Sequence, residues 1–433
     1  MSRKTFIIDT NVLLYDMTSI HSFPGNDVVL PLIVLDELDR FKDKPGLLGE
    51  SARYVNRFLD ETRHRGSLTE GVYLEEIDQK IKVEFNTVEH LPADLNHSAG
   101  DNKILGVALA LSKKEKDVTV ITKDINFRVK CDVLKIPSED YYKDHINNLD
   151  NSQDLYSGSV TIKTDKSNID KFFSEGKLDI DDIDYESELH QNQFIVMKSL
   201  SCNGSALGRI MGENIVPVEP KINELVKVNP RNKEQKFALD LLTDDSIQLV
   251  TITGIAGSGK TFLTLMSALS GIYSEKYNRI VITRSMQPVG KEIGFLPGTL
   301  DEKMSPWMSP IVDNFRCNFK DITYFEMMCQ KRQIEVAPLT YMRGRTFNDA
   351  FIIVDEAQNA TIHELKTIIT RVGENSKVIL LGDVEQIDTP YIDKLSNGLS
   401  IVTEKFKEST ITGHIRLEKG ERSPLATLAS KVL

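Results

Sequence analysis

Cysteine is scarce in this sequence, and the four that it contains lie far apart. Cys131, Cys202, Cys317 and Cys329 have neither the close spacing of a metal site nor the density of a disulfide-stapled secreted domain. We therefore expect reduced thiols and a cytoplasmic protein. Long hydrophobic runs are also missing, and the first residues, MSRKTF, lack the apolar core of a signal peptide. No membrane partner is expected.

An excess of positive charge is absent as well. The net charge of −11 argues against a protein that coats nucleic acid indiscriminately. The acidic residues concentrate in residues 141–220, whereas residues 221–433 are close to neutral. A local basic groove in the last segment remains compatible with this balance.

The 433 residues are too many for one ordinary core, so two or three domains are expected. Residues 1–140 and 221–433 both alternate short aliphatic strands with helical stretches, which predicts α/β domains with parallel sheets. Residues 141–220 differ, because they are acidic and carry the hairpin signal Asn203-Gly204 between two apolar runs. That segment is either a small β-rich connecting module or a partly ordered linker.

The strongest motif is GIAGSGKT, at residues 254–261, which follows an aliphatic strand and opens a helix. This is the context that a phosphate-binding P-loop requires. The glycines let backbone N–H groups surround phosphate oxygens, the lysine reaches the β- and γ-phosphates, and the threonine hydroxyl binds Mg²⁺. The predicted ATP-binding residues are Gly254, Gly257, Ser258, Gly259, Lys260 and Thr261.

Two further strands end in polar residues that suit the same site. FIIVDEAQN places Asp355 as the second Mg²⁺ ligand and Glu356 as the base that activates water. LLGDVEQID places Gln386 near the γ-phosphate, and Gln235 lies on the helix before the P-loop strand, where its amide can read adenine. A kinase needs only the aspartate, so the Asp-Glu pair favours hydrolysis.

Longer stretches resemble the PhoH family of ATPases. They are the P-loop, RSMQPVGKEIGFLPGTLDEKMSPW, APLTYMRGRTFNDAFIIVDEAQNAT and TRVGENSKVILLGDVEQID. The resemblance implies a RecA-like core similar to that of superfamily-one helicases, with nucleic acid as the track. Those helicases take an arginine from a second core, for which this chain has no room. We therefore expect a homo-oligomeric ring, with six copies as the candidate size. The candidate arginine donors are Arg343, Arg345, Arg371 and Arg416.

Four acids occupy comparable places in the N-terminal segment. Asp9 ends the strand FIID, Glu37 lies in VLDELDRFK, Asp101 opens the helix in GDNKIL, and Asp124 follows the strand DVTVIT. Carboxylates that converge on one sheet edge need a cation, and Mg²⁺, or Mn²⁺ in its place, suits an oxygen-only site. The alternative is structural, because Asp9 or Asp101 can cap a helix and Glu37 can belong to a solvated face.

IIDTNVLL, VLDELDRFK, GDNKIL and TKDINFR resemble, in order, the four motifs of PIN-domain ribonucleases. The resemblance implies that Asp9, Glu37, Asp101 and Asp124 are metal-binding and catalytic, with Asn11 and Thr122 as supporting polar groups. The whole chain is thus similar to PIN–PhoH fusion proteins.

The expected function is an ATP-dependent RNA helicase or translocase coupled to a metal-dependent endoribonuclease that acts on single-stranded or structured RNA. Two alternatives remain open from the sequence. One is a nucleotide-gated RNA-binding regulator with little nuclease activity, and the other is a small-molecule kinase.

Overall fold

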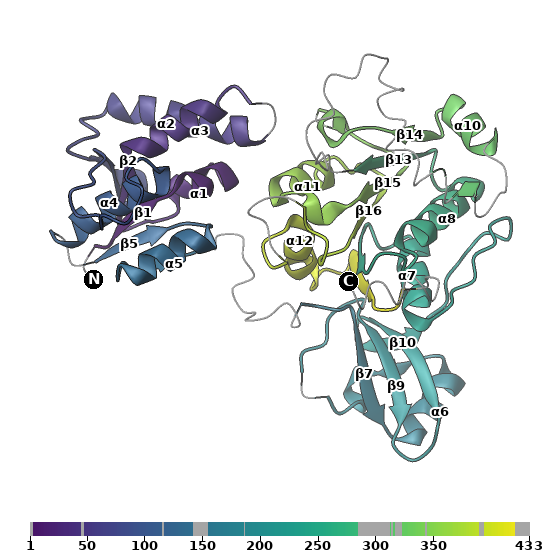
Figure 1. The fold of residues 1–433 in the computed structure, drawn as a ribbon. Coiled ribbons are helices and arrows are strands. Elements are labelled where there is room, and N and C mark those ends of the chain that lie inside the picture. Colours follow the sequence, from purple (N-terminus) through teal and green to yellow (C-terminus); the bar gives the residue numbers. More distant parts are fainter. Residues whose placement is uncertain are drawn as a thin grey trace. The chain divides into compact units, whose positions relative to one another are not determined.

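The structure is a computed structural model that describes residues 3–44, 47–114, 117–141, 155–185, 187–284, 312, 315–316, 323–342, 344–388 and 394–420. The chain divides into two compact units, residues 1–143 and 144–433 (Figure 1). Each unit is α/β and has its own hydrophobic core. No helix in these ranges is long and apolar enough to cross a membrane.

The first unit is a six-stranded sheet with the strand order β3-β4-β2-β1-β5-β6. Its strands are β1 Thr5–Ile8, β2 Asp27–Pro31, β3 Val72–Leu74, β4 Gln79–Glu84, β5 Val118–Ile121 and β6 Ser138–Glu139, and its helices are α1 Thr10–Tyr15, α2 Leu32–Phe41, α3 Leu47–Arg63, α4 Gly100–Ser112 and α5 Ile125–Val133. The sheet is parallel except for β3, which pairs antiparallel with β4.

The central strands of this unit bring separate parts of the sequence to one edge. β1 and β5 pair in parallel with Ile8 opposite Ile121, so the residues that follow both strands leave the sheet at the same edge. All four residues of β5 are buried, as are Ile7 and Ile8 of β1. The short aliphatic runs thus form the core, and the polar residues behind them gather at the carboxyl ends of the strands.

A small sheet opens the second unit. It has the order β7-β9-β10-β11-β8 and one covering helix, α6. The bounds are β7 Ser159–Thr164, α6 Lys166–Glu175, β8 Leu178–Asp179, β9 Phe194–Ser199, β10 Ser205–Met211 and β11 Asn214–Pro217. The hairpin signal is confirmed, since β9 and β10 pair antiparallel on either side of Asn203-Gly204.

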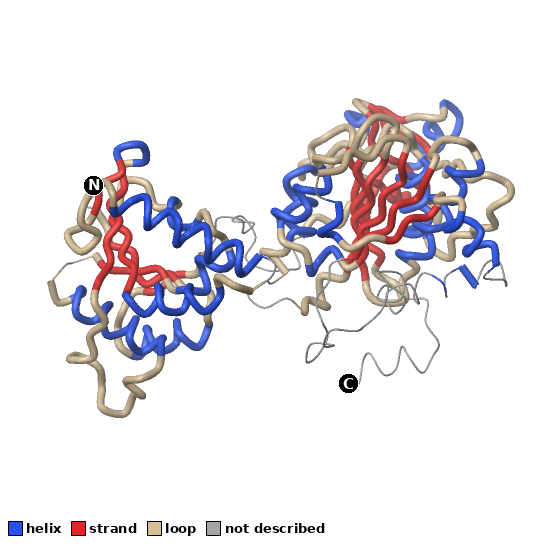
Figure 2. The backbone as a smooth tube through the Cα atoms, turned by 90° about the horizontal axis from the view of Figure 1, so that it is seen from above, coloured by secondary structure: helices blue, strands red, loops and turns tan. Residues whose placement is uncertain are grey.

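The larger sheet of the second unit is parallel throughout, with the order β14-β13-β15-β16-β12-β17. Its strands are β12 Leu249–Gly254, β13 Arg279–Arg284, β14 Ile334–Val336, β15 Ala350–Asp355, β16 Lys377–Gly382 and β17 Thr412–Leu417. The helices are α7 Lys233–Thr243, α8 Lys260–Tyr273, α10 Thr323–Gln330, α11 Ile362–Ile369 and α12 Gly398–Phe406. Figure 1 shows α7 and α8 on one face and α11 and α12 on the other, and Figure 2 shows helices on both faces of this sheet.

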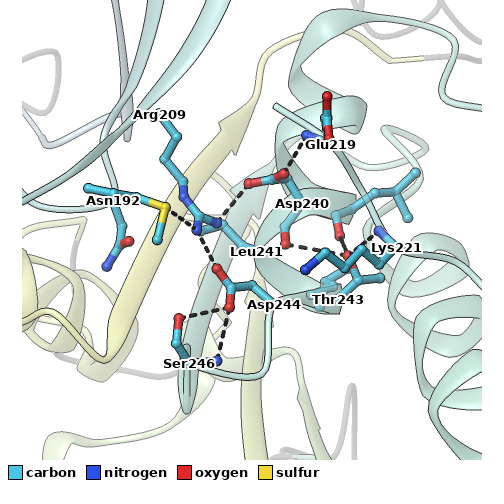
Figure 3. A network of polar contacts seen from close by, with 12 residues as sticks. Asn192, Arg209, Glu219, Lys221, Asp240, Leu241, Thr243, Asp244 and Ser246 are labelled. Carbon is cyan, nitrogen blue, oxygen red and sulfur yellow. Dashed lines mark hydrogen bonds and ion pairs between the residues drawn. The ribbon is translucent and has the colours of Figure 1, made fainter. Parts of the chain in front are cut away.

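A buried ionic network fixes the small sheet to α7. Figure 3 shows Arg209, on β10, between Asp240 and Asp244 at the end of the helix, with Nη1 2.7 Å from Asp240 Oδ2. Asp240 also accepts a bond from the Glu219 N–H at 2.9 Å. Burial raises the pKa of Asp240 against the pull of Arg209. At Asp244, hydrogen bonds from Ser246 and Arg209 outweigh burial and lower the pKa to about 2.

The stretch TIHELKTIITRVG predicts a helix that begins at the capping box of Thr361 and Glu364 and ends just before Gly373. Helix α11 confirms the first of these boundaries and corrects the second. Thr361 and Glu364 form the capping box at its start. The helix ends at Ile369 with Thr370 as C-cap, whereas the sequence predicts an end next to Gly373. Gly373 has another role, because a Cβ there would lie 1.8 Å from Asn348 Oδ1. Close packing, and not a helix cap, requires the glycine.

Candidate active sites of the two units

The first predicted site begins with Asp9, directly after β1. Asp9 occupies the N-cap position of α1, but its side chain makes no capping hydrogen bond. Its Oδ2 instead accepts a bond of 2.6 Å from the Thr122 hydroxyl, which lies beyond β5. Asp9 is only 4% exposed, so its carboxylate is buried.

Thr122 organises this edge of the sheet. Its hydroxyl oxygen accepts bonds from Asn11 Nδ2 at 3.2 Å and from the Asp124 N–H at 3.1 Å. Asn11 Oδ1 in turn accepts the Lys123 N–H at 3.1 Å. The structure thus links Asn11 to Thr122 and Thr122 to Asp9, as expected of supporting groups. Both ends of the Asn11 amide are used, so its orientation is fixed.

Glu37 and Asp101 lie within electrostatic reach of Asp9. Burial raises the pKa of Asp9 to about 7 against the Thr122 hydrogen bond, and Asp101 and Glu37 raise it further. Glu37 Oε2 accepts a bond of 2.5 Å from the Thr10 hydroxyl. Its Oε1 lies against the start of α4, where a Cβ on Gly100 would be only 2.2 Å away. Three of the four predicted acids are therefore neighbours.

The structure reassigns the capping roles. Asp124 caps α5, with Oδ1 accepting the N–H groups of Asn126 at 2.7 Å and Phe127 at 3.2 Å. Asp101 is not the cap of α4, since Ala99 holds that position and Asp101 lies in the first turn. Asp101 Oδ2 is 3.1 Å from Lys130 Nζ on α5. Asp124 therefore has a structural role besides any metal contact.

The donor set fits a hard divalent cation that keeps part of its water. Within the described ranges, no three of these four carboxylates lie within 4.8 Å of one another. Mg²⁺ is commonly held by one or two carboxylates directly while it retains several waters. Burial is the main cause of the raised pKa of Asp9, with smaller contributions from Asp101 and Glu37, and a bound cation would offset both effects.

In the second unit the P-loop follows β12 and leads into α8. Gly257 and Gly259 have φ values of 78° and 94°, a left-handed conformation that favours glycine. α8 begins at Lys260 without a side-chain cap, so its first N–H groups are available to an anion. Lys260 Nζ donates to the carbonyls of Gly254 at 2.5 Å and Ile255 at 3.2 Å. Ser258 Oγ is buried and lacks a hydrogen-bond partner.

Gln235 supports the P-loop from α7. Its Nε2 donates to the Ser258 carbonyl at 3.0 Å, and its Oε1 accepts the Arg231 N–H at 2.8 Å. The side chain is buried, and a Cβ on Gly259 would lie 3.2 Å from Nε2. The predicted adenine contact would need one of these two bonds to open.

Asp355 and Glu356 lie at the same sheet edge, at the end of β15. Glu356 has a φ of 54°, which is strained for a residue with a side chain. Its Oε1 is 3.2 Å from Arg284 Nη2, and its Oε2 accepts a 2.6 Å bond from Gln358 Nε2. Burial and Glu356 raise the pKa of Asp355, while Arg284 and Lys260 oppose this rise. Both acids are therefore held near positive charge.

Sequence reasoning missed Arg284 and Gln358. Gln358 is fully buried, and its amide links Glu356 to the loop after β16: Nε2 also donates to the Gln386 carbonyl at 2.9 Å, and Oε1 accepts the Asp383 N–H at 3.1 Å. Arg284 ends the aliphatic run NRIVITR, which predicts a strand, so it was identifiable from the sequence. Gln358 offered only its place in DEAQN. Gln386 itself is exposed at this edge.

A pocket of about 330 Å³ opens beside the P-loop, lined by Gly254, Asp383 and Arg416 among others. Arg416 thus lies beside the P-loop of its own chain, at the edge of the sheet where a nucleotide would bind. Arg345 is held in a two-bond ion pair with Glu335, at 2.5 and 2.9 Å. Arg343 lies outside the described residues.

Comparisons with known proteins agree with both halves. Residues 6–142 match the family described as PIN domain, and residues 227–432 match the family described as PhoH-like protein. Protein PhoH2 of Bacillus subtilis is 39% identical over 99% of this chain and 100% of that protein, and Protein PhoH2 of Thermobispora bispora is 33% identical over 99% and 96%. Protein PhoH of Escherichia coli is 38% identical over 44% of this chain and 52% of that protein. The chain therefore belongs to the PhoH2 family, in which a PIN nuclease domain precedes a PhoH-like ATPase domain.

Proposed function

We propose that the chain is an ATP-driven RNA helicase or translocase whose PIN domain cleaves the RNA that the ATPase domain supplies. The observation that carries this proposal is the presence of two phosphate-directed sites in one chain, the Asp9 cluster and the P-loop. We assign the domains to residues 1–140 and 221–433, with residues 141–220 as a connecting module. We place the protein in the cytoplasm.

In the nuclease site, Asp9, Glu37, Asp101 and Asp124 would hold Mg²⁺ or Mn²⁺. A bound ion of this kind supplies an activated water and stabilises the departing oxygen of a phosphodiester. Thr122 orients the Asp9 carboxylate, and Asn11 fixes Thr122. Single-stranded RNA is the favoured substrate, since a site on a sheet edge needs an exposed backbone. By family likeness, the products carry a 5′-phosphate and a 3′-hydroxyl.

In the ATPase site, the P-loop N–H groups and Lys260 bind the phosphates, and Thr261 and Asp355 would hold Mg²⁺. Glu356 accepts the proton of the attacking water, and Arg284 and Gln358 position it. Gln386 senses the γ-phosphate. Arg416 lies close enough to the P-loop to act within its own chain, and a ring of six copies is the alternative source of an arginine.

The test uses a 5′-labelled RNA hairpin with a single-stranded tail, with Mg²⁺ or Mn²⁺ and with or without ATP. We expect Asp9→Asn to abolish cleavage and spare ATP hydrolysis. Lys260→Ala should lower ATP hydrolysis on the order of 100-fold and abolish cleavage within the hairpin while sparing cleavage of the tail. Equal loss of both activities in both variants would refute the assignment of cleavage to the PIN domain and of ATP hydrolysis to the ATPase domain.

A second candidate is a nucleotide-gated RNA-binding regulator. The observations that favour it are the capping role of Asp124 and the ion pair of Asp101 with Lys130, which compete with metal binding. It predicts RNA affinity that depends on ATP, with no cleavage in either metal.

A further inference from the structure

A second group of metal-ligand side chains lies in the ATPase unit, outside both sites described above. Glu188, His190 and Glu408 each offer a ligand atom, and these atoms all lie within 4.8 Å of one another. It is the only group of three or more histidine, cysteine or acidic side chains this close together in the described parts of the chain. Glu188 and His190 precede β9, whereas Glu408 follows α12.

The histidine is buried and directed into the group. His190 is 8% exposed, and its Nδ1 lies 2.7 Å from Glu408 Oε1. The two atoms are close, but their relative orientation does not suit a hydrogen bond. Nδ1 is therefore a buried nitrogen without a hydrogen-bond partner. An unsatisfied buried ring nitrogen next to a carboxylate oxygen is the arrangement that a shared cation would satisfy.

The negative charge of the group is not balanced by nearby basic residues. In the described parts of the chain, the ion pair found for these carboxylates is the contact of Glu408 with His190. Lys407 is adjacent in sequence, but it pairs with Glu404 at 3.1 Å. A cation held by the buried imidazole would also meet the charge of these two carboxylates.

The surrounding backbone holds the two segments against each other. Asn192 Nδ2 donates to the carbonyls of Thr410 at 2.9 Å and Thr412 at 2.8 Å. The His190 N–H donates to Gln193 Oε1 at 2.9 Å, and the Tyr156 ring packs edge-on against the imidazole with centroids 5.1 Å apart. The ligand-bearing segments are thus fixed before any ion binds, which lowers the entropy lost on binding.

We propose that Glu188, His190 and Glu408 bind a first-row divalent transition metal, with Zn²⁺ as the best match. One imidazole and two carboxylates form a mixed nitrogen and oxygen donor set, which suits zinc better than Mg²⁺ or Ca²⁺. The site lies near the amino end of β17, whereas the P-loop pocket lies at its carboxyl end. The metal therefore ties the small sheet to the ATPase sheet and takes no part in phosphate chemistry.

The test measures Zn²⁺ bound per full-length chain by elemental analysis after dialysis against a zinc buffer. All proteins carry Asp9→Asn, which weakens the nuclease site. We expect one Zn²⁺ per chain, lost in Glu408→Gln and in Glu188→Gln but retained in the control Glu213→Gln, which changes an exposed glutamate of the same unit. The Glu408 side chain is 61% exposed, so we expect its substitution to leave folding intact. Co²⁺ should give a visible absorption spectrum that only the Glu213→Gln and parent proteins share.

Thermal unfolding supplies the second readout. Saturating Zn²⁺ should raise the Tm of the parent protein by about 3 °C or more and leave Glu408→Gln unchanged. Zinc content that is equal in the parent and in Glu408→Gln would overturn the proposal. So would a parent protein that binds no zinc.

Discussion

Asp9 is a buried carboxylate whose surroundings disfavour its ionised form. Burial and two neighbouring acids raise its pKa from 3.8 to about 7. Because the folded state then holds the proton more tightly than the unfolded chain, this group destabilises the metal-free fold as the pH rises from about 4 to about 7. Above that window the destabilisation is fully present, and a bound cation would relieve it.

We expect Asp9→Asn to raise the Tm of the first unit in the metal-free protein at pH 8, because it removes the buried charge. Mn²⁺ should stabilise the wild type and not the variant. Thermal unfolding with EDTA and with Mn²⁺ measures both effects, with Asp94→Asn at an exposed position as the control. A variant that melts below the wild type in EDTA would contradict this account.

The pKa of His414 is shifted downward, so its effect on stability has the opposite dependence on pH. Burial lowers its pKa to about 3, and its Nδ1 lies 2.7 Å from the Thr251 hydroxyl. The unfolded chain therefore binds the proton first, and stability is lost as the pH falls from about 6.5 towards 3.

At pH 5 this loss is about 2 kcal/mol relative to pH 7.5. Denaturant unfolding of the second unit at both pH values measures it. The loss should be smaller in His414→Gln and unchanged in His363→Gln, an exposed control in the same unit. Equal losses in all three proteins would assign the acid sensitivity to other groups.

At the level of elements, α7 connects the small sheet to the nucleotide site. Arg209 holds the end of this helix through Asp240 and Asp244, and Gln235 near its start donates to the Ser258 carbonyl of the P-loop. Lys377 contributes from β16, since its Nζ donates to three carbonyls around the end of α7 at 2.6 to 3.0 Å. Burial lowers the pKa of Lys377 to about 7.

We expect Arg209→Met to destabilise the second unit by about 3 to 5 kcal/mol, because it leaves Asp240 buried without its partner. The KM for ATP should rise through the displaced α7. Adding Asp240→Asn should recover part of the stability, since it removes the unpaired charge. Unfolding free energies of the single and double variants measure this coupling, and additive values would show that the two residues act independently.

The elements were predictable where the local chemistry decides them. β1, β12 and β15 follow from aliphatic runs, and the Thr361–Glu364 capping box follows from spacing alone. The caps of the first unit were not predictable, because Asp9, Asp101 and Asp124 all precede or open helices in the sequence. Only the position of Thr122 across the sheet distinguishes Asp9, which it holds inward, from Asp124, which caps.

At the level of the whole molecule, the sequence predicted both α/β folds and left residues 141–220 undecided. Their connection to the ATPase sheet rests on contacts between distant residues, such as Arg209 with Asp240 and Asn192 with Thr412. Spacing along the chain carries no signal for such pairs. The position of Gln358 between Glu356 and the loop after β16 was hidden for the same reason.

The proposed coupling makes a prediction about the chain as a unit. If the ATPase domain supplies RNA to the nuclease, covalent linkage keeps the nuclease site at a high effective concentration near the unwound RNA. A protein cut between Lys143 and Asp144 and assayed as a mixture of the two parts should still cleave single-stranded RNA and hydrolyse ATP. It should lose cleavage within the hairpin at least 10-fold, because unwound RNA closes again before the separate nuclease arrives. Gel analysis of the labelled hairpin measures this, with the uncut chain as control. Hairpin cleavage at the uncut rate would mean that the two activities share a chain without passing RNA between them.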